Sequence, residues 1–99
     1  MTDERADVQV ENNEAEHQFE TMVDGHRGVL TYSVEDGKLY LLHTGVDEAL
    51  EGQGVGSALV RSAAEHARRE GLRIVPFCHF AKGWLQRHDE YADLVSRSE

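Results

Sequence analysis

A glycine-rich segment that runs into an amphipathic pattern is the feature that most constrains how this chain folds. Residues 50–57 read LEGQGVGS and carry glycines at positions 52, 54 and 56. Because glycine lacks a Cβ, the backbone can turn sharply there and approach a ligand closely, and the free N–H groups of the first helical turn then point out of the loop. The segment therefore predicts a loop and helix start that can hold an anion.

The residues after the glycines predict a helix that continues to Glu70. Its apolar stripe consists of Val55, Leu59, Ala63 and Ala67, and its charged side of Arg61, Glu65, Arg68 and Arg69. This spacing is typical of a helix with one buried face. Gly71 is expected to follow the helix as its C′ residue, with Leu72 making the accompanying apolar contact.

Before the glycine segment, apolar residues recur at every second position, which predicts strands. The expected strands cover residues 7–11, 17–23, 27–34 and 39–44. Turns are expected at Asn12-Asn13, at Asp24-Gly25 and at residues 35–37, and the Asp-Gly pair is a strong signal for a type I′ hairpin. The pattern predicts a four-strand antiparallel meander.

After the helix, residues 73–76 are short and β-branched and predict one more strand, parallel to the strand at 39–45. Pro76 marks the end of that strand or an edge position. Apolar residues then recur at three- and four-residue intervals, which predicts one or two short helices packing on the sheet: Phe80, Ala81, Trp84, Leu85 and Tyr91. The expected fold class is α+β, with a mixed, mostly antiparallel sheet, a central helix after the glycine loop and a helical C-terminus.

Length and charge exclude several classes of protein. Ninety-nine residues suffice for one domain with a modest core, expected at residues 7–99 after a flexible tail at residues 1–6. A formal net charge of −9 makes nucleic acid an unfavourable partner, and no apolar run approaches the ~20 residues that a membrane span needs. The polar, acidic start does not match a secretory signal, so a cytoplasmic protein is expected.

Cysteine and histidine usage gives no sign of a metal site. The chain has one cysteine, Cys78, and six histidines. A single cysteine excludes an internal disulfide and a thiolate cluster for zinc, and the histidines lack the spacing of metal ligands. No metal is predicted.

The glycine segment resembles motif A of the GNAT superfamily of acetyl-CoA-dependent N-acetyltransferases, whose loop reads Gln/Arg-x-x-Gly-x-Gly/Ala. Gly54 and Gly56 match this pattern, whereas Glu51 stands where the family usually has Gln or Arg. A carboxylate there would repel a diphosphate unless its side chain turns to solvent. A dinucleotide-binding motif fits less well because the third glycine comes one position early, and a Walker loop lacks its Gly-Lys-Ser/Thr.

The resemblance extends to the small, single-domain branch of this superfamily and implies acetyl-CoA as cofactor. The residues that it assigns to the coenzyme are Thr44, Gly45, Val46, Gly52, Gln53, Gly54, Val55, Gly56 and Ser57. The function that it implies is acetyl transfer to an unidentified amine. Two alternatives stay open: a coenzyme A or acyl-CoA binding module without turnover, and a small interaction protein that keeps only the fold.

The acceptor site is expected to be small, open or completed by a protein partner. Full-length GNAT domains place helices between their first strands to build that site, whereas Asn12-Asn13 is expected only to turn the chain here.

Cys78 and His43 are the candidate catalytic residues. Cys78 follows Val75-Pro76 in a Pro-x-Cys pattern that resembles the small branch, where the thiol would face the thioester. It could accept the acetyl group or protonate the departing coenzyme thiolate, and a buried apolar thiol is the alternative. A reactive thiolate needs a partner that lowers its pKa, for which His43 and His79 are candidates. His43 could equally be an ordinary half-buried strand residue.

Residues 87–91 resemble the Arg-His-Pro-Glu-Tyr ending of the same branch, with Asp89 in place of proline. A structural role is expected for this segment. Tyr91 should pack on the core, and His88 should cap the C-terminus of a helix, where a cation is favoured.

Overall fold

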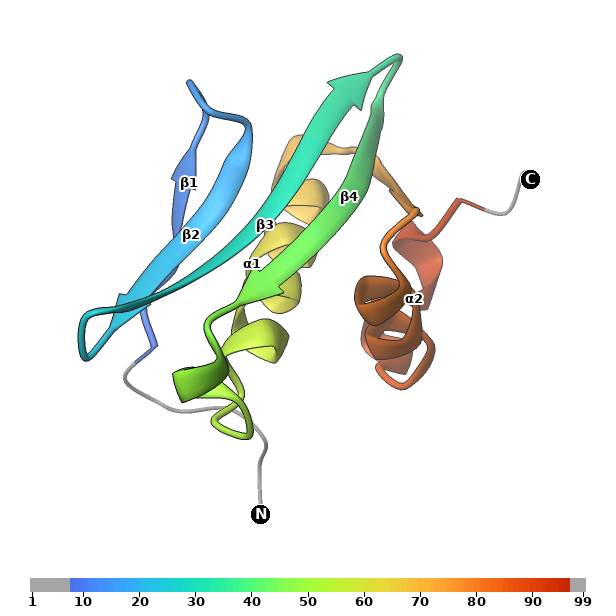
Figure 1. The fold of residues 1–99 in the computed structure, drawn as a ribbon. Coiled ribbons are helices and arrows are strands. Elements are labelled where there is room, and N and C mark those ends of the chain that lie inside the picture. Colours follow the sequence, from blue (N-terminus) through green and yellow to red (C-terminus); the bar gives the residue numbers. More distant parts are fainter. Residues whose placement is uncertain (1–7, 97–99) are drawn as a thin grey trace.

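The computed structural model describes residues 8–96, and the tail expected at residues 1–6 lies outside this range. A five-stranded sheet has one long helix across one of its faces, with the C-terminal helices beside it (Figure 1). The elements in chain order are β1 (Glu11–Asn13), β2 (Gln18–Val23), β3 (His26–Glu35), β4 (Lys38–Val46), the 3₁₀ helix η1 (Glu48–Leu50), α1 (Val55–Glu70), β5 (Arg73–Pro76), α2 (His79–Gln86) and the 3₁₀ helix η2 (Asp89–Leu94). The sheet order is β1-β2-β3-β4-β5.

The first four strands form the predicted antiparallel meander. Val23 pairs with His26 and Glu35 pairs with Lys38, so each of these hairpins turns through two residues. In the first hairpin Asp24 and Gly25 have φ angles of 52° and 80°. Two successive positive φ angles are typical of a type I′ turn, which confirms the prediction made from Asp24-Gly25.

The predicted turn at Asn12-Asn13 is wrong. Both residues lie in β1, and the chain turns instead at residues 14–17. Asparagine side chains bind neighbouring groups here: Asn12 Oδ1 accepts a hydrogen bond from the Tyr32 hydroxyl at 2.6 Å, and Asn13 Oδ1 accepts one from the Glu16 N–H at 3.2 Å. These contacts hold the two asparagines in an extended strand that the local sequence did not indicate.

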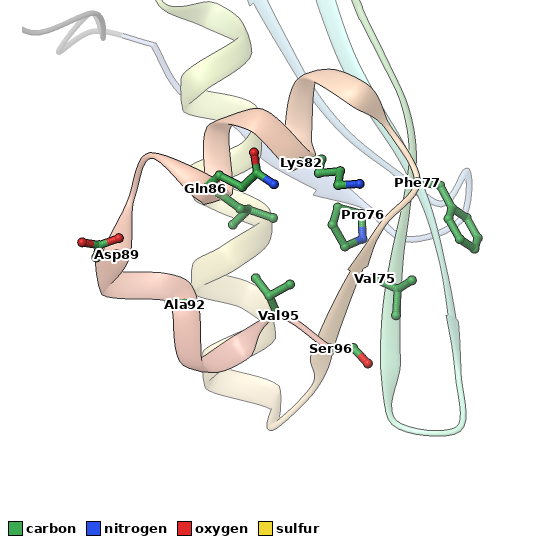
Figure 2. Close-up of a pocket in the computed structure, with 10 residues that line it drawn as sticks. Val75, Pro76, Phe77, Lys82, Gln86, Asp89, Ala92, Val95 and Ser96 are labelled. Atoms are coloured by element: carbon green, nitrogen blue, oxygen red, sulfur yellow. The ribbon is translucent and has the colours of Figure 1, made fainter. Parts of the chain in front are cut away.

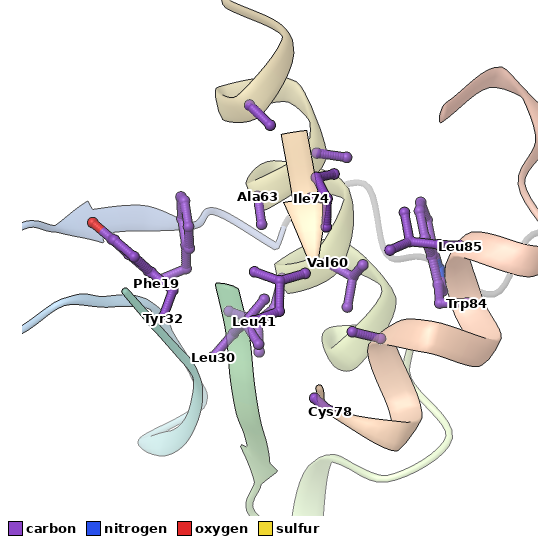
Figure 3. Close-up of a cluster of buried hydrophobic side chains, with 14 of the residues drawn as sticks. Phe19, Leu30, Tyr32, Leu41, Val60, Ala63, Ile74, Cys78, Trp84 and Leu85 are labelled. Carbon is purple, nitrogen blue, oxygen red and sulfur yellow. The ribbon is translucent and has the colours of Figure 1, made fainter. Parts of the chain in front are cut away.

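Helix α1 has the predicted bounds and the predicted buried stripe. All four stripe residues are at most 1% exposed. The helix also buries Val60 and Ala64, because it packs against α2 as well as against the sheet (Figure 3). Gly71 has a φ of 71°, and Leu72 N–H donates to Ala67 O at 2.8 Å, so the expected glycine end of the helix is confirmed.

Strands β4 and β5 are parallel, as predicted, but they pair over four residues only. The pairing runs from Lys38 with Arg73 to Leu41 with Pro76. Beyond it, the N–H groups of Phe77 and Cys78 both donate to Leu41 O at 3.0 Å, and the chain turns into α2 while β4 continues to Val46. Pro76 ends an edge strand, which confirms its predicted place.

The C-terminal segment packs as predicted. Tyr91 is buried, and His88 Nδ1 lies 2.7 Å from Trp84 O near the end of α2, with its ring stacked on the Trp84 indole at a centroid distance of 3.6 Å. His88 therefore caps α2. Val95 forms a parallel bridge with Ile74 on the outer edge of β5. Among residues 8–96, no helix has the length and apolar character to cross a membrane.

Candidate active site

A cleft lies between the end of β4, the glycine loop and the start of α2. Its volume is ≈ 370 Å³, and its walls are formed by Thr44, Val46, Glu51, Gly52, Gly56 and Phe80. Four of these residues, Thr44, Val46, Gly52 and Gly56, are among those that the family resemblance assigns to the coenzyme. The structure therefore brings the strand end and the glycine loop together around one space.

The glycine loop places the N-terminus of α1 at this cleft. Gly54 is the N-cap residue of α1 with a φ of 80°, a conformation that L-residues with a side chain rarely adopt. As a glycine, this N-cap residue has no side chain to cap the helix, and the first turn contains no acidic residue. An anion is favoured at such a helix start by both the backbone N–H groups and the helix dipole.

Gln53, which was predicted to bind the coenzyme, forms hydrogen bonds within the loop. The backbone N–H of Gln53 donates to Leu50 O at 3.2 Å, and its side-chain amide donates to Ala49 O at 3.1 Å. Gln53 therefore stabilises the turn between η1 and α1, and its backbone N–H is already engaged there. The start of α1, from Gly54 onward, is the better candidate for binding the coenzyme.

Gly56 allows an aromatic ring to close one wall of the cleft. A Cβ placed on Gly56 would lie only 2.9 Å from Cζ of Phe80. The Phe80 ring, on the first turn of α2, thus packs directly on the glycine backbone while its residue stays 42% exposed. Phe80 was not among the predicted site residues, because a lone aromatic at helical spacing is more often part of a core.

Cys78 lies at the inner side of Phe80, just before α2. It is 8% exposed and sits among the buried side chains of the core (Figure 3). Its Sγ lies 3.1 Å from Oγ1 of Thr44. Because Thr44 also lines the cleft, this contact joins the thiol to the space beside the glycine loop.

The pKa of the Cys78 thiol lies below its ordinary value. Burial raises this pKa, but the hydroxyl of Thr44, the N–H groups of Ala81 and Phe80 and the backbone of Thr44 together lower it by more. The two helical N–H groups lie close enough to favour negative charge on sulfur, although neither makes a side-chain cap hydrogen bond. The surroundings thus favour the thiolate, the reactive form of cysteine.

The structure does not bring His43 to this thiol. His43 pairs with Thr31, whereas Thr44 pairs with the buried Leu30 on the face covered by α1. Adjacent strand residues point to opposite faces, so the His43 ring lies on the other side of the sheet from the sulfur. His79 is exposed at the start of α2. The prediction of His43 as the partner of Cys78 is therefore wrong, whereas His79 as a partner stays a prediction. The side chain within hydrogen-bond distance of the sulfur is Thr44.

A β-bulge explains this difference. Thr31 pairs with His43 and the next residue, Tyr32, pairs with Leu41, so Leu42 is an extra residue in β4. Without it, regular alternation would place His43 on the same face as Leu41. With it, Leu41 and Thr44 both face α1.

Glu51 also lines the cleft. It is exposed and follows η1, where its backbone N–H donates to Glu48 O at 3.1 Å. Glu51 is therefore part of the wall of the cleft near the start of α1.

A second hollow lies on the far side of β5, between that strand, α2 and η2 (Figure 2). It has a volume of ≈ 500 Å³ and is mostly apolar, with Lys82 and Asp89 among its residues. None of the sequence-predicted site residues lines it. Among residues 8–96, no group of three His, Cys, Asp or Glu side chains is close enough to hold a metal ion.

Comparison with known proteins identifies the family of this chain. Residues 18–94 match the family model of the GCN5-related N-acetyl-transferase domain. The NMR solution structure of a Staphylococcus aureus protein, described as a "GCN5-like putative N-acetyltransferase", is similar with a TM-score of 0.73 and 33% sequence identity. That match covers 96% of this chain and 94% of the other.

The fold and the site thus define a protein of the N-acetyltransferase class. This chain belongs to the GCN5-related N-acetyltransferase (GNAT) family, and the α+β fold expected from the sequence is confirmed.

Proposed function

We propose that the protein transfers the acetyl group of acetyl-CoA to an amine, with the coenzyme held in the cleft beside the glycine loop. The observation that carries this proposal is the contact of Thr44 with Cys78, which places the single thiol of the chain next to a cleft with an uncapped helix start.

The residues of the cleft fit a coenzyme A diphosphate. Gly54 has the positive φ of 80° that brings the chain into α1, Gly56 accepts the Phe80 ring against its backbone, and the start of α1 offers N–H groups to an anion. The exposed Phe80 ring and Val46 offer apolar surface to the pantetheine arm. Acetyl-CoA supplies the activated acetyl group when it is bound.

Cys78 is the proposed reacting group of the protein. Its thiolate would attack the thioester carbonyl and release the coenzyme as a thiolate. The acceptor amine would then attack the acetyl-cysteine, form the amide, lose a proton and release the Cys78 thiolate. The alternative role is general acid, in which the Cys78 thiol protonates the departing coenzyme thiolate while the amine attacks directly.

Binding without turnover is the second candidate function. Two observations favour it: Glu51 lines the cleft, and only the turn at residues 14–17 stands between β1 and β2. An acceptor site without its own helices would be open. The sheet face opposite α1 carries no described element (Figure 1) and exposes Met22, Leu42 and Phe77, which is an apolar surface suited to a protein partner.

Mass spectrometry separates these functions. The protein is incubated with acetyl-CoA alone, and then with a panel of amines and peptides. A nucleophilic Cys78 leaves an acetyl group on this residue in the first sample and an acetylated amine in the second. A general acid gives only the acetylated amine. Retained coenzyme with neither product supports a binding module, and no retained coenzyme rejects the site.

A further inference from the structure

We propose that Thr44 is the positioning residue for Cys78: its hydroxyl fixes the orientation of the sulfur and stabilises the thiolate. The catalytic role of this contact rests on the proposed function. The contact itself and its effect on the thiolate involve only these two side chains. Nothing in the sequence pattern pairs them, since they are 34 residues apart.

The backbone of both residues is held in place, which makes the contact between their side chains specific. Cys78 N–H donates to Leu41 O at 3.0 Å, and Cys78 O accepts from Lys82 N–H at 2.9 Å. Thr44 is fixed by its pairing with Leu30 in the β3–β4 ladder. Rotation about the Cα–Cβ bond is therefore the main freedom left to the thiol, and the Thr44 hydroxyl selects one orientation of it.

The bulge at Leu42 is what makes this contact available. It turns Thr44 toward α1 and the start of α2, where the sulfur lies, and it turns His43 to the opposite face. A hydroxyl can donate to a thiolate or accept from a thiol, so it can serve both protonation states of Cys78. An apolar residue of the same shape could fill the space but could not do this.

The groups that most affect the thiol are uncharged. They are the Thr44 hydroxyl and backbone and the N–H groups of Phe80 and Ala81. The titratable residues closest to Cys78 in the chain are His79 at the exposed start of α2 and Lys82, which lines the hollow on the other side of β5. His43 lies across the sheet, and Glu51 is in the cleft wall. Removing the Thr44 hydroxyl should therefore leave no other side chain to take over its role.

The test uses the fact that Cys78 is the only cysteine. The rate of alkylation by iodoacetamide is measured against pH, without acetyl-CoA or amine, for the wild type, Thr44→Val and Thr44→Ser. A hydrogen bond to a charged group is worth enough to shift the midpoint in Thr44→Val upward by about one to two pH units. Thr44→Ser keeps the hydroxyl and should return the midpoint to the wild-type value.

The matched control is Thr31→Val. Thr31 lies on the other sheet face, where its hydroxyl donates to His43 O at 3.4 Å, so the same change is made without touching the sulfur. Its alkylation midpoint should equal that of the wild type. Far-UV circular dichroism verifies that each variant is folded, and if Thr44→Val does not fold, Thr44→Ala replaces it. A wild-type midpoint in the folded hydroxyl-free variant would overturn the inference.

Turnover is measured separately, so that the inference and the proposed function can fail independently. With an amine from the panel, Thr44→Val should lose about tenfold or more in kcat at neutral pH and regain part of it at higher pH, since more Cys78 is then ionised. A shifted alkylation midpoint with unchanged kcat would keep the thiol–hydroxyl pair and reject the catalytic use of Cys78.

Discussion

The two ends of the cleft arise in different ways. At one end, the glycine loop and the start of α1 are built from consecutive residues, and the signals for the turn and the helix lie within that stretch. At the other end, Thr44 and Cys78 come from separate elements and meet only because β4 contains an extra residue. The first end is suited to binding an anion, and the second to reacting with a thioester. Substitutions should therefore separate affinity for the coenzyme from turnover.

The largest expected effect is on turnover in Cys78→Ala. Either proposed role of the thiol predicts a fall in kcat of about 10²-fold or more, since proton transfer or nucleophilic catalysis typically contributes this much. Affinity for coenzyme A should change little, because Cys78 is 8% exposed and lies behind Thr44, which forms the wall of the cleft at that end. Steady-state kinetics and calorimetry measure the two quantities.

The companion variant Cys78→Ser tests whether the chemistry of the thiol, and not only its volume, is needed, because a hydroxyl has neither the acidity nor the nucleophilicity of a thiol. It should therefore be as slow as Cys78→Ala. If Cys78→Ala keeps the full rate, the thiol is ordinary packing. Direct attack by the amine, assisted by His43, His79 or water, would then be the better mechanism.

The next effect is on affinity, in Gly56→Ala. The added Cβ would lie 2.9 Å from the Phe80 ring, so the ring must move into the cleft or away from α1. We expect affinity for coenzyme A to fall by about tenfold or more, which corresponds to about 1.4 kcal/mol or more of binding free energy. Calorimetry measures it, and the rate of Cys78 alkylation should change little.

Gly83→Ala is the control for this change. Gly83 lies within α2, and a Cβ there would have its nearest neighbour, Arg87 Nη1, at an ordinary 3.5 Å. Coenzyme affinity should be unchanged, and the free energy of unfolding should rise by up to about 1 kcal/mol because glycine is a poor helix former. Equal affinities in Gly56→Ala and the wild type would show that the Phe80–Gly56 wall is not part of the coenzyme site.

The contrast between the two ends of the cleft also explains which features could be predicted from the sequence alone. The bounds of α1, its glycine end and the Asp24-Gly25 hairpin were predicted correctly because each depends on residues within a few positions of one another. Regular alternation through β4 would have put His43 beside Leu41, and no local signal marks Leu42 as the extra residue. The partner of Cys78 could not be predicted because one unmarked residue exchanged the two faces of the strand.

The prediction of a turn at Asn12-Asn13 was wrong for a related reason. Asparagine favours turns when its side chain binds the nearby backbone, and Asn13 does so with Glu16. Asn12, however, binds the Tyr32 hydroxyl, which lies 20 positions away. The long-range contact continues the strand two residues past its predicted end at Glu11, so the turn forms at residues 14–17 instead.

The smallest effect is expected at Glu51, and it tests whether the binding end is as favourable to an anion as its backbone suggests. Glu51 lines the cleft, and its carboxylate should weaken the binding of a diphosphate. Because the residue is exposed, solvent and salt screen the repulsion, so Glu51→Gln should tighten coenzyme A binding only about two- to fivefold. Glu51→Arg should tighten it further, and both gains should shrink as the salt concentration rises.

Glu48→Gln is the control, since it removes a carboxylate of η1 that does not line the cleft. Calorimetry at low and high salt measures these differences. If Glu51→Gln and Glu48→Gln have the same dissociation constant at low salt, the Glu51 side chain points away from the diphosphate, and the departure from the family pattern at this position has no effect on binding.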